Sequence, residues 1–191
     1  RASGMVGFVT LGGKLYQRLA QVQGSISPPL PLPSSMQFNL IGSATRTQYV
    51  TLTNFDSHTF ELRVQLSYRK NGTYAATTLG YQNDNALAAR PGGDRSGYNL
   101  NVVLRRSLGE LLTGELNYTK QGWDSTAMYA PGLIDQMRSQ TTHALRGALQ
   151  YAVAKNQTLQ LEARLVRNRE NISIFQYNNR QLQVSWQWHD R

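Results

Sequence analysis

The chain has 191 residues, of which 40% are hydrophobic and 16% are charged, and its formal net charge is +9. The charged share is below the roughly 25% that is usual for soluble domains, and Gln, Asn, Ser and Thr supply much of the polar half. The absence of cysteine excludes disulfides and Cys-based metal or redox sites, and no apolar stretch reaches the roughly 18 residues of a transmembrane helix. The basic residues are scattered, with no run longer than Arg105-Arg106, so the charge does not predict a nucleic-acid partner.

The alternation of apolar and polar residues is least regular in the N-terminal segments. Residues 1–26 fit either one long strand kinked at Gly12-Gly13 or a hairpin, and the sequence leaves both open. Residues 27–35 are rich in proline, which has no N–H to donate to a β-ladder, so this segment is predicted to be a turn. Residues 36–50 follow as a strand with apolar side chains at alternate positions over most of its length.

Strict alternation is clearest in residues 59–69. Every second side chain from Phe60 to Tyr68 is apolar, and the side chains between them are polar or charged. Successive residues of a strand point to opposite faces, so this pattern predicts one apolar and one polar face. Asn71-Gly72 is the favoured pair for a type I′ hairpin turn, since both positions take positive φ. The chain then returns through a strand at residues 73–82.

The same alternation defines the later strands. They are predicted at residues 98–106, 112–120, 143–153, 159–166 and 181–188. Together with the N-terminal segments, this pattern gives about nine or ten antiparallel strands.

The connections after residue 60 alternate in length. The short ones are 71–72, 107–110 and 154–157, and the long ones are 83–96, 122–140 and 169–179. Tight periplasmic turns and longer extracellular loops are typical of outer-membrane barrels, whereas a Greek-key sandwich has no reason to sort its loops in this way. In a barrel the last strand would then run inward and place the C-terminus in the periplasm.

A soluble sandwich or a lipocalin-like barrel would also show alternation, but strand length and side-chain type favour a membrane. The strands match the roughly 9–11 residues that cross a bilayer at a tilt. The apolar faces often end in aromatic residues, as expected of girdles at the two membrane interfaces. These candidate interface aromatics are Tyr68, Tyr81, Tyr98, Tyr118, Tyr151, Trp186 and Trp188. The opposite faces carry charges inside the strands, and the candidate lumen charges are Glu61, Arg63, Arg105, Glu115, Arg146, Glu162 and Arg164.

These lumen charges have two interpretations. Arginine outnumbers glutamate among them, so a water-filled interior would favour anions. In a barrel of about eight to ten strands, however, side chains largely fill the interior, and the same charges would form structural salt bridges.

No catalytic, cofactor or metal site is predicted. His58, His143 and His189 are far apart in the sequence, whereas a metal site needs converging ligands. No GxSxG elbow positions a nucleophile near them, so we do not expect an enzyme.

Residues 149–188 resemble the last three strands of the barrels that follow tetratricopeptide repeats in Gram-negative outer-membrane proteins, closest to the surface lipoprotein assembly modifier type. The features that carry the resemblance are Arg167 and Asn168, then Asn171, Ile172 and Ser173, then Tyr177 and Arg180, and more faintly Tyr49, Phe55 and Asp56. Two features depart from it: no tetratricopeptide helix pair precedes the strands, and Trp188 is followed by His-Asp-Arg. The resemblance implies a translocation or surface-assembly module, with an exported polymer, a lipoprotein or an envelope protein complex as partner.

The sequence therefore predicts one all-β domain over residues 1–191, an antiparallel up-and-down transmembrane β-barrel or the C-terminal part of a larger one. The expected location is the bacterial outer membrane, with membrane lipid as a partner and no cofactor. Two alternatives stay open: a structural or adhesive barrel that binds a partner through its long loops, and a soluble basic β-barrel that binds an anionic ligand.

Overall fold

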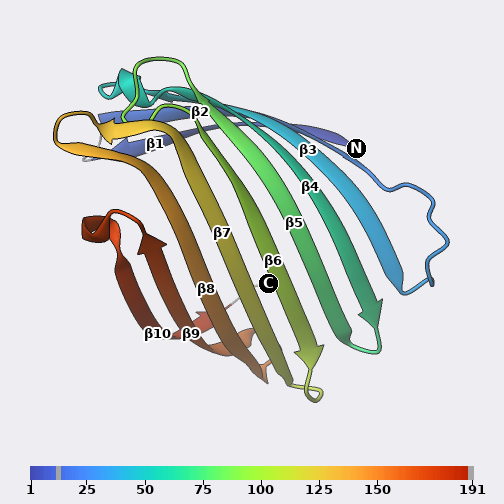
Figure 1. The fold of residues 1–191 in the computed structure, drawn as a ribbon. Coiled ribbons are helices and arrows are strands. Elements are labelled where there is room, and N and C mark those ends of the chain that lie inside the picture. The colour runs from blue at the N-terminus through green and yellow to red at the C-terminus, as the bar shows by residue number, and fades with distance from the viewer. Residues whose placement is uncertain (12–13, 189–191) are drawn as a thin grey trace.

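The chain folds into a single antiparallel sheet of ten strands in the order of the sequence, β1 to β10 (Figure 1). The structure is a computed structural model and describes residues 1–11 and 14–188. The strands are β1 (Ala2–Leu11), β2 (Lys14–Ile26), β3 (Met36–Tyr49), β4 (Ser57–Lys70), β5 (Thr73–Ala86), β6 (Arg95–Ser107), β7 (Leu112–Ala130), β8 (Ile134–Ala154), β9 (Gln157–Glu170) and β10 (Tyr177–Trp188). The predicted all-β, up-and-down antiparallel architecture is confirmed.

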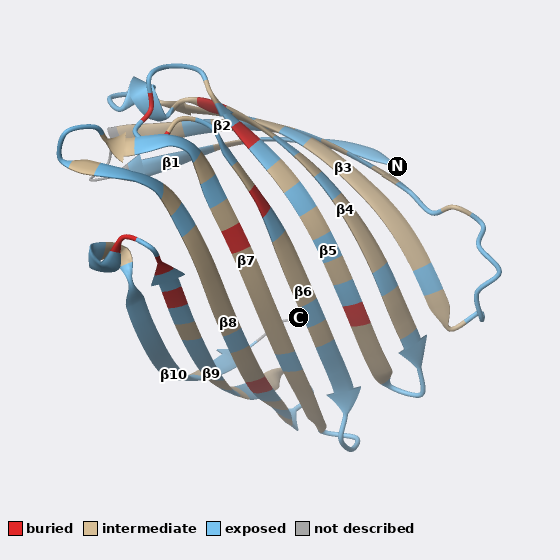
Figure 2. Ribbon diagram, in the orientation of Figure 1, coloured by how far each residue is buried: buried red, intermediate tan, exposed pale blue. Residues whose placement is uncertain are grey.

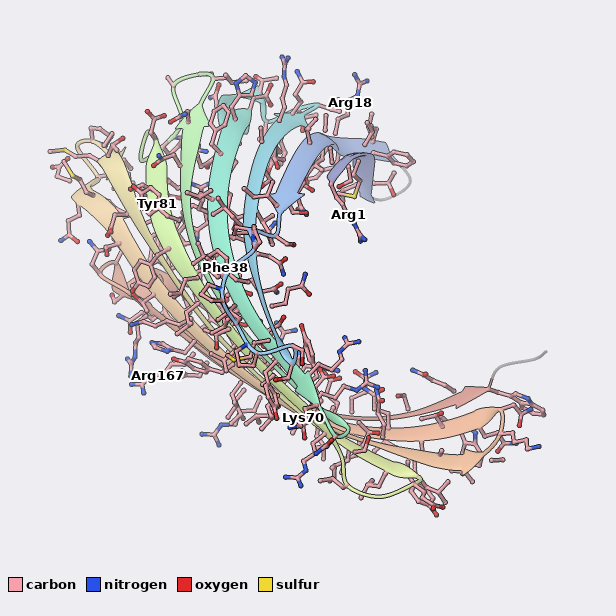
Figure 3. The ribbon with its side chains drawn as sticks, turned by 90° about the vertical axis from the view of Figure 1, so that its right-hand side faces the viewer. Arg1, Arg18, Phe38, Lys70, Tyr81 and Arg167 are labelled. Carbon is pink, nitrogen blue, oxygen red and sulfur yellow. The ribbon has the colours of Figure 1, made fainter. Side chains whose placement is uncertain are left out.

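The sheet does not close on itself within the described residues, whereas the sequence left open either a complete barrel or part of a larger one. β1 and β10 stand at the two ends of the strand order and do not pair with each other. The sheet is nevertheless strongly curved, and its concave side opens to the right in Figure 3. Closure requires the tilt and stagger of the strands to bring the first and last edges within hydrogen-bonding distance, which these ten strands do not achieve.

The N-terminal segment is a hairpin, which settles the alternative that the sequence left open. β1 pairs with β2 from Ala2↔Gly24 to Leu11↔Lys14, with a register shift between Val9 and Thr10. Gly12 and Gly13 lie outside the described residues. The proline-rich segment 27–35 contains no strand and connects β2 to β3, as predicted.

The β4–β5 turn has the predicted geometry, since Asn71 has φ 49° and Gly72 has φ 71°. This turn, segments 108–111 and 155–156, and the proline-rich connection lie at one end of the sheet, which we call the turn end. The opposite end, the loop end, carries the short 3-10 helices η1 (Thr53–Phe55) and η2 (Ser173–Phe175) and the segments 87–94 and 131–133.

The predicted long loops are shorter than expected because the strands extend into them. β7 and β8 have 19 and 21 residues and leave only residues 131–133 as their connection. The prediction of a loop over 122–140 is therefore wrong. Alternation ends there because the side chains become mostly polar and the remaining apolar ones, such as Trp123 and Met128, do not recur at every second position. Polar side chains do not stop backbone pairing, so the hairpin continues beyond the apolar part of the sheet.

The sheet has no second layer, and almost no apolar side chain is buried. The buried hydrophobic residues are Ala76, Ala148 and Ile172 among those described. Figure 2 accordingly shows few buried positions along the strands. Large apolar side chains are instead exposed along one face, for example Val6 at 84% and Leu182 at 74%. Folding here does not bury the apolar face against the rest of the described chain.

Candidate functional site

The two faces of the sheet follow from the register. Residues paired across antiparallel strands point to the same side, so one face carries the row Leu62, Tyr81 and Tyr98, and the other carries Arg63 and Asn99. Figure 3 places Phe38, Tyr81 and Arg167 on the convex side of the curved sheet. The convex face is therefore the apolar one, and the concave face is polar.

All seven predicted lumen charges lie on the concave face. The register aligns Arg105 with Glu115, and the same row continues through Ala148 to Glu162. The neighbouring row pairs Arg146 with Arg164. Glu61 and Arg63 stand two residues apart on β4, closer to the loop end. The sequence correctly grouped these residues on one face, but it did not show which of them interact.

Arg146 on β8 joins two acidic side chains from the strands on either side. Its guanidinium donates to Glu115 Oε1 on β7, and its Nη2 donates to Glu162 Oε2 on β9 at 2.8 Å. Gln160 Nε2 also donates to Glu162 Oε2, at 3.2 Å. This Arg146 cluster ties three neighbouring strands together, so these charges include structural ion pairs, as one of the two interpretations predicted.

A second cluster surrounds Glu61. Asn99 Nδ2 on β6 donates to Glu61 Oε1 at 2.9 Å and reaches across β5 to do so. The intervening position on β5 is Gly80, where an added Cβ would lie 2.7 Å from the Asn99 amide and 2.9 Å from Arg63 Cγ. Arg63 Nε lies 3.5 Å from Glu61 Oε2, while its Nη2 donates to Gln23 Oε1 at 2.9 Å. Gly80 thus provides the space through which β4 and β6 interact directly.

Arg105 and Arg164 differ from the other arginines of the concave face. Among the described residues neither forms an ion pair, although Arg105 faces Glu115 in the register. The carboxylate of Glu115 is engaged by Arg146 instead. Arg69 also lies on this face near the turn end and stacks on the Tyr74 ring at 5.3 Å. Arginines without an ion pair among the described residues therefore lie on the concave face near the turn end (Arg69 and Arg105) and at the middle of β9 (Arg164).

The loop end holds an ion-pair cluster that the sequence did not reveal. Asp84 on β5 accepts from Arg90 Nη1 at 2.7 Å and from Arg95 Nη2 at 2.6 Å, and from Thr59 at 3.0 Å. The side chains of Asp84 and Arg90 are 3% and 2% exposed. Burial alone would raise the pKa of the Asp84 carboxyl, but hydrogen bonds from Arg95 and Ser57 and the charges of both arginines outweigh it, so the pKa lies below its usual value.

A second loop-end ion pair joins β8 to β9. Arg138 Nη2 donates to Glu170 Oε2 at 3.1 Å, and the guanidinium lies 4.2 Å from the Phe175 ring centroid and 5.5 Å from that of Tyr129. These contacts hold η2 against the β7–β8 hairpin. The sequence prediction missed this pair and Asp84 because both lie in segments read as loops, where no periodicity marks a face.

The candidate interface aromatics occupy the ends of the apolar runs on the convex face. Tyr81, Tyr98 and Tyr118 lie toward the loop end. The others, Tyr68, Tyr151, Trp186 and Trp188, lie toward the turn end. The hydroxyl of Tyr118 is 2.9 Å from His143 Nδ1. Their function as a membrane girdle stays a prediction, but their positions at two levels suit it.

His58 and His143 stand on different strands, and His189 lies outside the described residues. In the part of the chain that the structure describes, no group of three or more His, Cys, Asp or Glu side chains could hold a metal ion. Neither of the two short 3-10 helices, the only helices within residues 1–11 and 14–188, has the length and apolar character needed to cross a membrane.

Comparison with known proteins gives a similarity to solved structures but no similarity in sequence to a known family. No family model and no curated protein matches the chain. The crystal structure of the β domain of the Bordetella autotransporter Brka is similar to it, with 14% identity, a TM-score of 0.49, and coverage of 89% of this chain and 77% of that chain. A structural similarity at this level is no evidence that this chain has the activity or the partners of that protein. The resemblance to the assembly modifier type has no match among these comparisons and stays a prediction.

Proposed function

We propose that the chain forms a β-barrel wall in the bacterial outer membrane and serves as a translocation, export or surface-assembly module. The observation that carries this proposal is the bare convex face. Its apolar side chains have no protein layer over them within the described residues, and an exposed apolar surface of this extent indicates contact with another apolar phase. Lipid is the phase that fits a curved sheet with its opposite face polar.

The dimensions of the apolar run support a bilayer. On β4 the run extends from Phe60 to Tyr68, and the polar His58 and Lys70 bound it. At about 3.3 Å per residue, eight residues span about 26 Å along the strand, close to the roughly 25 Å apolar band of membrane barrels before tilt is considered. The equivalent run on β6, Tyr98 to Leu104, is bounded by Ser96 and Arg106. The run shifts along successive strands, as expected of tilted strands.

The concave face supports movement of a polar cargo. It is lined by hydrogen-bonded polar side chains and by the Arg146 and Glu61 clusters, which keep most charges compensated. Arg105 and Arg164 are not compensated in this way. We propose that they attract an anionic segment of an exported polymer or lipoprotein along the part of the concave face between the middle of β9 and the turn end.

The membrane location is tested by solubility, and the movement of an anionic cargo is then tested by conductance. The protein should require detergent and show a heat-modifiable shift in electrophoresis, and solubility without detergent would contradict the membrane location. In planar bilayers, the double variant Arg105→Gln plus Arg164→Gln should lower the preference for anions. The control Lys70→Gln plus Arg106→Gln removes the same charge from the convex face and should leave the selectivity unchanged.

A second candidate function is adhesion through the loop end. The Asp84 cluster and the Arg138–Glu170 pair fix this end, and a hollow of about 200 Å³ there is lined by Arg95, Trp123 and Tyr129, among others. An electrically silent barrel would favour this function over translocation. The alternative of a soluble β-barrel has no support, because the apolar face of the described sheet has no core to join.

A further inference from the structure

The apolar runs of the convex face together form an apolar band across the sheet. A group of arginines lies on this face just beyond the loop-end limit of that band. Arg167 and Arg169 lie two residues apart on β9 and point to the same side. Arg180 on β10 is a diagonal neighbour of Arg167, because Arg167 pairs with Asn178. Diagonal neighbours on one face of a sheet are about 7–8 Å apart, within the reach of two arginine side chains toward one ligand.

Within residues 1–11 and 14–188, these arginines have no acidic partner. Among the described residues none of the three forms an ion pair, and only Arg169 makes a side-chain hydrogen bond, to Gln176 at 3.4 Å. No Asp or Glu occupies a convex position on β9, on β10 or on β8 between residues 139 and 153. The concave face shows the opposite arrangement, since the acidic side chains of all six ion pairs lie there.

The arginines line a hollow that has both basic and apolar walls. The hollow has a volume of about 370 Å³, and its walls include Arg167, Arg180 and His143 as well as Leu145 and Leu165, which stand in the same register row as Arg180. A free anion would leave the leucines exposed to water, and a neutral lipid would leave the arginines without a counter-charge. An anionic amphiphile would place its charge beside the arginines and its apolar chain beside the leucines.

We propose that this hollow binds the phosphate headgroup of an anionic lipid, with Arg167 and Arg180 on the phosphate and the acyl chain along Leu145 and Leu165. The inference rests on the proposed membrane location. With the loop end outward, the bound lipid belongs to the outer leaflet. The site would fix the vertical position of strands β8 to β10 in the bilayer, because the phosphate marks the level at which the hydrocarbon ends.

The test is native mass spectrometry of the detergent-purified full chain after exchange with phosphatidylcholine containing a minor fraction of phosphatidic acid. The wild type should retain phosphatidic acid selectively. Arg167→Gln plus Arg180→Gln should weaken this retention about thirtyfold, since each arginine beside an anionic lipid surface is worth about a factor of five. Lys70→Gln plus Arg106→Gln, with the same loss of charge at the turn end, should retain it as the wild type does.

Three outcomes overturn the inference: equal retention by both double variants, no selectivity in the wild type, and displacement of the lipid by inorganic phosphate, which would make the hollow a site for a free anion. If the double variant loses its heat-modifiable shift, the single variant Arg180→Gln at an exposed position replaces it, with about fivefold weaker retention expected. Failure of the wild type to require detergent would contradict the membrane location itself. A wild type that requires detergent but does not select phosphatidic acid contradicts only the lipid site.

Discussion

The convex and concave faces are built from alternate residues of the same ten strands, yet they are stabilised by different interactions. The convex face consists of exposed apolar side chains with few polar contacts. The concave face is held by cross-strand hydrogen bonds and ion pairs such as Arg146–Glu162 and Glu61–Asn99. One sheet therefore contacts two environments, so the same substitution should destabilise the protein by very different amounts at adjacent residues.

The largest effect is expected from a charge placed on the convex face. Val102 and Val103 are adjacent on β6 and point to opposite faces, so Val102→Arg and Val103→Arg are a matched pair. Val102→Arg would put a cation in the middle of the apolar band and should lower the free energy of unfolding in lipid by about 2–4 kcal/mol, while Val103→Arg should cost less than about 1 kcal/mol. Urea unfolding of both variants in vesicles measures this. Equal losses would mean that the convex face does not lie in lipid.

A more local loss of stability is expected at the loop end from Asp84→Asn. The change leaves the buried guanidinium of Arg90 without its counter-charge, which should cost about 3 kcal/mol and loosen the segment 87–94. Hydrogen exchange of this segment and chemical unfolding measure the loss. Asp124→Asn is the control, because Asp124 is an exposed acid at the same end without an ion pair among the described residues. Similar effects of the two changes would contradict a structural function of the Asp84 cluster.

The Asp84 cluster also makes the stability of the loop end depend on pH, and the direction of this dependence follows from the pKa of Asp84. Because the pKa of Asp84 is lowered in the folded protein, its stabilisation is fully present above the ordinary value of 3.8 and is lost as the pH falls below it. The wild type should therefore lose stability at the loop end in acid, and Asp84→Asn should lack this part of the acid sensitivity. Hydrogen exchange of residues 87–94 as a function of pH checks the prediction, and identical acid profiles of the two proteins would contradict it.

The smallest effect is expected from filling the space over β5. In Gly80→Val the new side chain would displace Asn99 and Arg63 and break the hydrogen bond to Glu61, at a cost of about 1–2 kcal/mol. Gly147→Val on the convex face is the control for the loss of a strand glycine itself, since nothing lies within 4 Å of the Cβ that it would add. Chemical unfolding of both variants should separate them. If Gly147→Val lost as much stability as Gly80→Val, the space beside Asn99 would not be the reason for the glycine at position 80.

The sequence predicted the strands and their faces well wherever one face is apolar. Alternation in residues 59–69 placed Glu61 and Arg63 opposite Phe60 and Leu62, and the register of β4 confirms it. The Asn71-Gly72 turn was equally clear, because few residue pairs accept two positive φ angles in succession. Both signals are local and need no knowledge of distant strands.

Prediction failed where both faces become polar. The extension of β7 and β8 to Ala130 and Ile134 was read as a loop, although the backbone pairing continues there. Asp84, Arg138 and Glu170 lie in such segments, so neither their faces nor their partners could be inferred. A strand with polar residues on both sides carries no period-two pattern, and its existence depends on a partner strand elsewhere in the chain.

By itself, the sequence determined the order of the hairpins and the separation of an apolar from a polar face, because both depend on the alternation of neighbouring side chains. The tertiary structure alone decided that Arg146 binds both Glu115 and Glu162, while Arg105 and Arg164 form no ion pair with the described residues. It also decided that the edges of β1 and β10 stay apart in the described sheet. Ion pairing and closure depend on the stagger and curvature summed over many strands, which no local pattern encodes.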